Sequence, residues 1–150
     1  MQRAIDLSMK NVRSSEGGPF AAVIVRAGSI VAEGANRVTS TLDPTAHAEI
    51  VAIRAACQAL GHFQLTDCEL YTTCEPCPMC MGAIYWARLR KIYYASTRND
   101  AAQIGFDDSF IYDQIALDPA SRKIEMIQIM REQALQAFRE WETSQTKIRY

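Results

Sequence analysis

The stretch PCPMC at residues 76–80, together with HAE at residues 47–49, determines how this chain is interpreted. The two motifs supply three zinc ligands, His47, Cys77 and Cys80, and one carboxylate, Glu49, that is not needed as a ligand. A structural zinc normally has four protein ligands, whereas a site with three leaves a position for water. Zinc lowers the pKa of such a water from about 16 toward about 7, and a nearby carboxylate can carry its protons. The motifs therefore predict an open catalytic zinc site with Glu49 as its proton carrier.

The spacing of the two cysteines predicts the local structure around them. Cys77 and Cys80 are three residues apart, which places both side chains on one face of a helical turn. Pro78 suits the first position of a helix that starts directly after Cys77. The exposed N–H groups and the macrodipole at a helix N-terminus favour the thiolate form, which is the form that binds zinc. We therefore expect a helix over residues 78–87 that begins at the metal.

A second helix start precedes the histidine. Residues 43–45 read DPT, a capping side chain followed by an early proline, and predict a helix over residues 45–60 that ends at Gly61. In a regular helix His47 and Glu49 would diverge by about 200°. We therefore place His47 in an irregular first turn, from which Glu49 reaches back to the water.

Other interpretations of the cysteines are weaker. A lone CxxC motif also occurs in redox pairs and in zinc ribbons, but a ribbon needs a second ligand pair and a redox pair needs no HxE motif. Cys74 extends the pattern to CxxCxxC, yet it lies at the end of a predicted strand and before the helix start. We expect Cys74, like Cys57 and Cys68, to be a buried core thiol.

Composition limits the class of protein. A chain of 150 residues, 49% of them hydrophobic, suits one domain over residues 1–150. Five cysteines, an odd number, argue against a disulfide framework and favour a cytoplasmic location. No long apolar run indicates a signal peptide or a membrane span. A formal net charge of −1 gives no attraction to a phosphate backbone, so we expect neither a nucleic-acid nor a membrane partner.

Hydrophobic periodicity predicts an α/β protein, a three-layer α/β/α sandwich with a five-stranded mixed sheet. Helices alternate with strands along most of the chain, which favours parallel pairing with crossover helices. The expected strands are residues 20–26, 30–36, 69–73, 91–95 and 124–130. The expected helices are residues 2–14, 45–60, 78–87, 107–115 and 132–142, followed by a tail over 144–150.

Four longer stretches carry a resemblance to known proteins: GGPFAAV at 17–23, DPTAHAE at 43–49, TCEPCPMCMGAIYWAR at 73–88 and GFDDSFIY at 105–112. On these residues the chain resembles the cytidine deaminase-like superfamily of zinc-dependent nucleobase deaminases, and within it the bacterial guanine deaminases. The resemblance spans nearly the whole chain. It implies hydrolysis of guanine to xanthine and ammonia, a step of purine salvage and catabolism, with one zinc per subunit.

The resemblance also assigns roles to residues. It implies that His47, Cys77 and Cys80 hold the zinc, that Glu49 shuttles protons, and that Asp108 contacts the substrate and is a second proton carrier. The substrate-binding residues implied in this way are Phe20, Asn36, Ala48, Trp86, Asp108 and Tyr150.

Several of these residues have plainer alternatives in the sequence itself. Asn36 also suits a turn that closes a strand, and Phe20 and Trp86 also suit core packing. Either Asp107 or Asp108 could cap the helix that follows, which leaves the other for the pocket. Tyr150 alone suggests a frayed terminus. Only the resemblance makes the tail over 144–150 a lid, and it also implies a homodimer that exchanges C-terminal segments by a domain swap.

Two other functions remain open at this stage. The tRNA adenosine deaminases share the HAE and PCxxC segments, but they act on a flipped base of a large anionic partner, and this chain has no basic excess. A non-catalytic protein stabilised by zinc would require Glu49 to be structural.

Overall fold

The computed structural model describes residues Met1–Tyr150, and its contacts divide the chain into two compact units, Met1–Asp108 and Ser109–Tyr150. The first unit contains a sheet with helices on both faces. The second contains helices and irregular segments.

The sheet of the first unit has four strands in the order β2-β1-β3-β4. Strands β1 (Ala21–Arg26) and β2 (Ser29–Ala35) form the predicted antiparallel hairpin. Strand β3 (Cys68–Cys74) pairs antiparallel with β1 and parallel with β4 (Lys91–Ser96). The sheet is therefore mixed, as expected.

The prediction of a fifth strand over residues 124–130 is wrong. This segment is rich in isoleucine and methionine, but it forms no ladder with another strand, and residues 125–130 have no regular structure. Its last residue, Met130, adopts a left-handed φ of 51° and starts the helix that follows, which an extended strand cannot do. A short apolar run can indicate a strand, but a strand also needs a neighbouring strand whose backbone groups bond its N–H and C=O groups.

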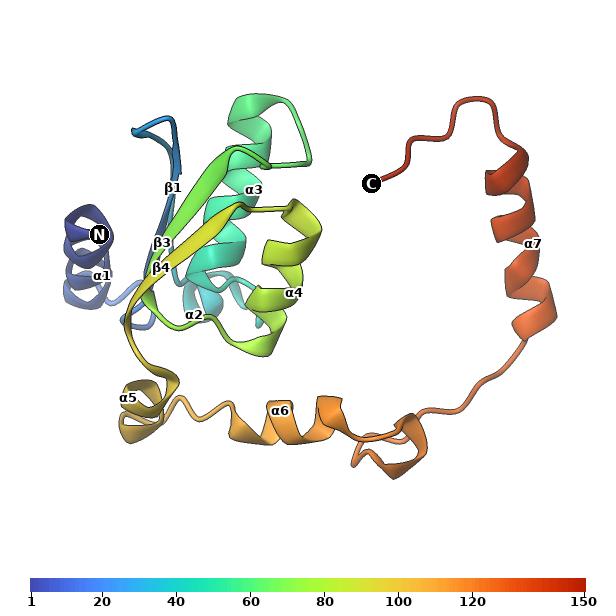
Figure 1. The fold of residues 1–150 in the computed structure, drawn as a ribbon. Helices are drawn as coiled ribbons and strands as arrows, with labels where there is room; N and C mark the ends of the chain where they lie inside the picture. The colour runs from blue at the N-terminus through green and yellow to red at the C-terminus, as the bar shows by residue number, and fades with distance from the viewer. The chain divides into compact units, whose positions relative to one another are not determined.

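Three helices complete the layers of the first unit. Helix α1 (Gln2–Arg13) covers one face of the sheet, and α3 (Ala48–Leu60) and α4 (Pro78–Ala87) cover the other (Figure 1). Buried side chains such as Ile24 and Leu70 fill the space between the sheet and the α3/α4 layer. The arrangement is the predicted α/β/α sandwich with one strand fewer.

Helix α3 starts unusually close to the sheet. A Cβ atom on Gly34 of β2 would lie 2.3 Å from the carbonyl oxygen of Ala48, so this contact is possible only because residue 34 has no side chain. The close approach brings the start of α3, and with it His47 and Glu49, against the end of β2.

Two short helices of the first unit were not predicted, α2 (Val38–Thr41) and α5 (Arg98–Gln103). Helix α5 has a sequence signal that could have revealed it. Thr97 and Asp100 form a capping box, in which each side chain bonds the backbone N–H of the other residue. Helix α2 is a single turn and has no comparable signal.

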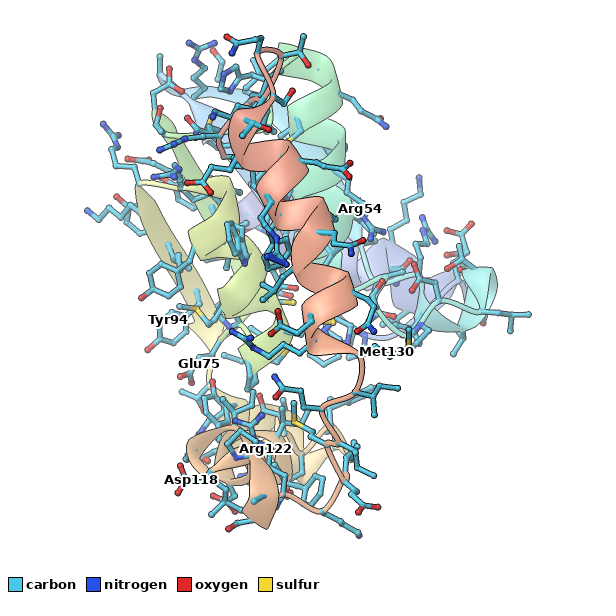
Figure 2. All side chains as sticks on the ribbon, turned by 90° about the vertical axis from the view of Figure 1, so that its right-hand side faces the viewer. Arg54, Glu75, Tyr94, Asp118, Arg122 and Met130 are labelled. Atoms are coloured by element: carbon cyan, nitrogen blue, oxygen red, sulfur yellow. The ribbon has the colours of Figure 1, made fainter.

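The second unit consists of α6 (Ser109–Ala116), a short 3-10 helix over Pro119–Ser121, and α7 (Arg131–Thr143). Arg122 folds back onto the end of α6, where its guanidinium donates to the carbonyl oxygens of Ile115 and Leu117 (Figure 2). None of the three helices has a buried residue. Across both units, no helix combines the length and the apolar character that crossing a membrane requires.

Candidate active site

His47 lies at the start of α3, directly after a turn over residues 43–45 that the sequence analysis assigned to the helix. The Asp43 carboxylate accepts bonds from the backbone N–H of Thr45 at 2.8 Å and from its hydroxyl at 2.7 Å. The DPT signal therefore closes a turn, and the helix begins at Ala48 instead of at residue 45. His47 is the N-cap residue with an extended backbone (φ −66°, ψ 155°), which frees its ring from the regular helical direction.

The two cysteines occupy the start of α4 as predicted. Cys77 is the N-cap residue, Pro78 is the first helical residue, and Cys80 is fully buried. The His47 Nδ1 atom lies 3.5 Å from the Cys77 sulfur and 3.6 Å from the Cys80 sulfur. The three ligand atoms all lie within 4.8 Å of one another.

This donor set fits zinc. In a tetrahedral site with Zn–S about 2.3 Å and Zn–N about 2.0–2.1 Å, a nitrogen and a sulfur ligand are separated by about 3.5–3.6 Å. The two nitrogen–sulfur distances of the site match this separation. The prediction that the two helix starts converge is confirmed, and the three side chains that they bring together could hold a metal ion.

Glu49 lies beside the ligands, on the inner face of the first turn of α3. Its carboxylate accepts a bond from the Cys80 thiol at 3.4 Å and another from the Thr72 hydroxyl at 3.2 Å. When Cys80 binds a metal as a thiolate it has no proton to donate, so Thr72 is the donor that persists. Thr72 is buried in β3, and sequence analysis missed it because a threonine in a strand carries no distinguishing signal.

The charges of the cluster are strongly coupled. Hydrogen bonds from Cys80 and His47 lower the pKa of the Cys77 thiol to about 4. The pKa of Cys80 is raised by its hydrogen bond to Cys77 and by burial. The pKa of His47 is raised by its own hydrogen bond to Cys77. Burial raises the pKa of the Glu49 carboxyl. These shifts favour a single thiolate in the metal-free protein, and a bound cation would supply the charge that stabilises a second one.

Cys74 stands apart from this cluster, as expected. It is the buried last residue of β3, its thiol lies 3.6 Å from the carbonyl oxygen of Thr97, and the metal-ligating group does not include it. Cys68 is also buried, whereas Cys57 is only partly buried.

Three of the expected substrate-binding residues lie in the first unit. Asn36 is buried directly after β2, and its backbone N–H donates to the carbonyl oxygen of Phe20. The Phe20 ring packs edge-on against Phe106, with the ring centroids 4.9 Å apart. Burial and the negative charge of Cys77 raise the pKa of Asp108, which places that carboxyl near the ligands, whereas Asp107 is exposed.

The other three expected residues differ from one another. Ala48 is fully buried as the first residue of α3. Trp86 lies in the last turn of α4 with 68% of its surface exposed. Tyr150 belongs to the second unit, and its role as a lid stays a prediction.

Comparison with known proteins agrees with this geometry. Residues 1–96 match the family described as the cytidine and deoxycytidylate deaminase zinc-binding region. The chain is 51% identical over 150 residues to the guanine deaminase of Bacillus subtilis, an alignment that covers all of this chain and 96% of that protein. The X-ray structure of a Bacillus subtilis guanine deaminase superposes with a TM-score of 0.96 at 52% identity, covering 99% of this chain and 95% of its own.

The chain belongs to the guanine deaminase family. Its fold is accordingly the cytidine deaminase-like α/β fold, and the predicted resemblance is confirmed. A further neighbour, solved in complex with 8-azaguanine, has a TM-score of 0.69 at 36% identity and covers 72% of this chain and 62% of its own.

The tRNA-editing relatives of this deaminase match a shorter part of it. The tRNA-specific adenosine deaminase of Agrobacterium fabrum is 43% identical over 95 residues, which cover 61% of this chain and 62% of that protein. The likeness to guanine deaminase extends over the whole chain, including the second unit.

Proposed function

We propose that this chain hydrolyses guanine to xanthine and ammonia, with one zinc per subunit. Two observations together support the proposal. His47, Cys77 and Cys80 converge on one site, and the chain is similar to guanine deaminase along all 150 residues. Xanthine formation would place the enzyme in purine salvage or catabolism. Five free cysteines support a reducing compartment, for which we propose the cytoplasm.

A zinc ion held by His47, Cys77 and Cys80 would supply the chemistry that makes water a nucleophile at neutral pH. Glu49 then moves the protons. It takes one proton from the attacking water and gives it to the ring nitrogen next to the carbon under attack. It then moves the remaining proton of that water to the amine, which leaves as ammonia when the C–N bond breaks and the carbonyl group forms. The raised pKa of Glu49 suits a group that must both accept and release protons. The balance is guanine plus water to xanthine plus ammonia.

Holding the base is assigned to residues around the cluster. The edge-on pair of Phe20 and Phe106 offers an aromatic wall, and Trp86 a second one. Asn36 and Asp108 supply hydrogen bonds to the edges of the purine. Ala48, the first residue of α3, lines the base-binding site. Asp108 would also act as a second proton carrier, in line with the burial and the nearby Cys77 charge that raise its pKa.

The substrate is tested by the release of ammonia from a panel of compounds. Zinc-loaded protein is incubated with guanine, guanosine, adenine, cytosine and a tRNA anticodon hairpin. We expect guanine to be deaminated at a kcat/KM at least about a hundredfold above the others, because a closed pocket leaves no room for a ribose. Efficient turnover of the hairpin would instead assign the chain to tRNA editing.

We further propose that residues 1–150 function as one deaminase domain within a homodimer, in which residues 144–150 of one subunit close the site of the other. The second unit supports this because it has no buried residue although it carries Ile124, Ile127 and Ile129 on its surface. Apolar side chains in that number favour an interface. Exchange of equivalent segments between subunits is a known route to dimers.

Subunit mixing tests the exchange. A Glu49→Gln chain and a Tyr150→Ala chain are each inactive or weak alone. After random subunit exchange of equal amounts, half of the dimers pair the two variants, and each of these contains one site with both an intact Glu49 and a borrowed Tyr150, so activity should recover toward one site per four chains. A mixture no more active than the sum of its two parts would show that each tail acts within its own chain.

A further inference from the structure

Asn11 is a buried polar side chain on α1 that the proposed chemistry does not use. Only 2% of its surface is exposed. Its Nδ2 donates to the carbonyl oxygens of Gly18 at 2.9 Å and of Asn36 at 3.0 Å, and its Oδ1 accepts from the Arg37 guanidinium at 3.0 Å. Both protons of the amide nitrogen are therefore used outside the helix. Removing one partner from such a buried network leaves unsatisfied groups behind, so the network resists rearrangement.

The two carbonyl groups that Asn11 binds belong to residues that are themselves linked. The backbone N–H groups of Gly18 and Val38 both donate to the side-chain Oδ1 of Asn36, each at 3.3 Å. Because both neighbours are N–H donors, the atom that faces them is the oxygen of the amide. The Nδ2 group of Asn36 is left to donate elsewhere.

The loop between α1 and β1, which contains Gly17 and Gly18, is packed too closely against Asn36 to accept a side chain at residue 17. A Cβ atom on Gly17 would lie 2.1 Å from the carbonyl oxygen of Asn36 and 3.1 Å from the Nδ2 of Asn11. Residues 17 and 18 are thus packed directly onto Asn36, and Asn11 ties both sides of this contact together. A shift of the loop would also move the Gly18 N–H that orients the Asn36 amide.

We propose that Asn11 is a positioning residue that fixes the amide of Asn36 with its Nδ2 toward the bound base. The site would therefore select a base whose facing edge carries a hydrogen-bond acceptor, a ring nitrogen or a carbonyl oxygen. The inference rests on the proposed function in that it takes Asn36 to be a base-binding residue.

The test measures base binding as well as turnover. The dissociation constant for 8-azaguanine is determined by calorimetry on zinc-loaded protein, next to KM and kcat for guanine. Asn11→Ala should weaken 8-azaguanine binding and raise KM about tenfold, with kcat changed less than about threefold and zinc content unchanged. Asn11→Asp, which keeps the size of the side chain but removes both donors, should do the same if the alanine variant folds poorly.

A double-mutant cycle separates positioning from stability. In an Asn36→Ala background, adding Asn11→Ala should change 8-azaguanine binding less than about twofold, because the group that Asn11 positions is already gone. Additive losses would overturn the proposal. The matched control is Ser8→Ala on the same helix: Ser8 is buried and donates to the carbonyl oxygen of Pro19 at 2.7 Å, but it does not contact Asn36. An equal effect of Ser8→Ala would reduce the role of Asn11 to general support of the loop.

The polarity of Asn36 has its own test. Asn36→Asp replaces the Nδ2 donor that is proposed to face the base by an oxygen acceptor. The other carboxylate oxygen can still accept from the backbone N–H groups of Gly18 and Val38. It should bind 8-azaguanine more weakly than Asn36→Ala does, and tighter binding would reverse the assigned orientation. If the unsubstituted protein binds 8-azaguanine but does not deaminate guanine, the result would count against the proposed function alone. Tight base binding in both Asn11 variants would count against this inference alone.

Discussion

The two units of this chain use apolar residues in opposite ways. In the first, Ile24 and Leu70 are completely buried. The helix starts that rest on this core bring His47 to both cysteine sulfurs and the Cys80 sulfur to Glu49. In the second, Ile127 is 71% exposed and no helix buries a residue. A catalytic cluster has to be held rigidly, so it lies where packing is dense. The second unit therefore exposes apolar residues of the kind that the first unit buries.

The largest expected effect comes from removing a ligand in the first unit. Cys77→Ala or Cys80→Ala should lose zinc, all measurable deamination and much of the thermal stability, because metal binding and folding are coupled at such a site. Metal content by mass spectrometry and the melting temperature check this. Cys74→Ala is the matched control, since it removes a buried thiol from the same CxxCxxC pattern and should keep its zinc. Retention of zinc in both ligand variants would mean that the ligands are misassigned.

Glu49→Gln should reduce kcat by about 10²–10⁴-fold while zinc content and fold are kept. The amide has nearly the same size as the carboxyl group but cannot cycle a proton. Zinc-normalised activity of this variant is the measurement. If it deaminates guanine at the rate of the unsubstituted protein, Glu49 is structural.

Tyr150→Ala addresses the second unit. We expect a loss in kcat/KM of about tenfold, which corresponds to about 1.4 kcal/mol of aromatic contact with the bound base or the rim of the pocket. Zinc content and melting temperature should not change, because Tyr150 lies outside the core of the first unit. Unchanged kinetics would identify the tail as an ordinary chain terminus.

The smallest effect is expected from Thr72→Val, which removes the hydroxyl that donates to Glu49 but keeps the shape of the side chain. Loss of one buried hydrogen bond, about 1 kcal/mol, should lower kcat about fivefold and leave KM nearly constant. Thr73→Val is the control, because the Thr73 hydroxyl accepts from the backbone N–H of Ala21 and does not contact Glu49. It should reduce stability without lowering kcat, and equal kinetics for the two variants would exclude a positioning role for Thr72.

The same contrast explains what the sequence could predict. Helix α4 was predicted with the correct ends because Cys77 and Pro78 are local start signals that no distant contact overrides. The convergence of the two helix starts followed from zinc chemistry, which demands it. The start of α3 was misplaced because Asp43 and Thr45 bond each other in a turn, and that choice depends on geometry rather than on residue type.

What could not be predicted depends on partners in space. Residues 124–130 are as rich in apolar residues as a buried strand, but no strand pairs with them, so their composition was misleading. Thr72 and Asn11 acquire their roles only because folding places them next to Glu49 and Asn36. No property of a threonine in a strand or of an asparagine in a helix distinguishes them beforehand.

The central claim is that this chain is a guanine deaminase whose zinc site depends on Glu49 for proton transfer. The most direct measurement follows xanthine and ammonia together during incubation with guanine, for zinc-loaded protein, for the same protein after chelation, and for zinc-loaded Glu49→Gln. We expect equal amounts of both products from the zinc-loaded protein, none after chelation, recovery on adding zinc back, and at least a hundredfold loss in the variant. Guanine left unchanged by fully zinc-loaded protein would contradict it.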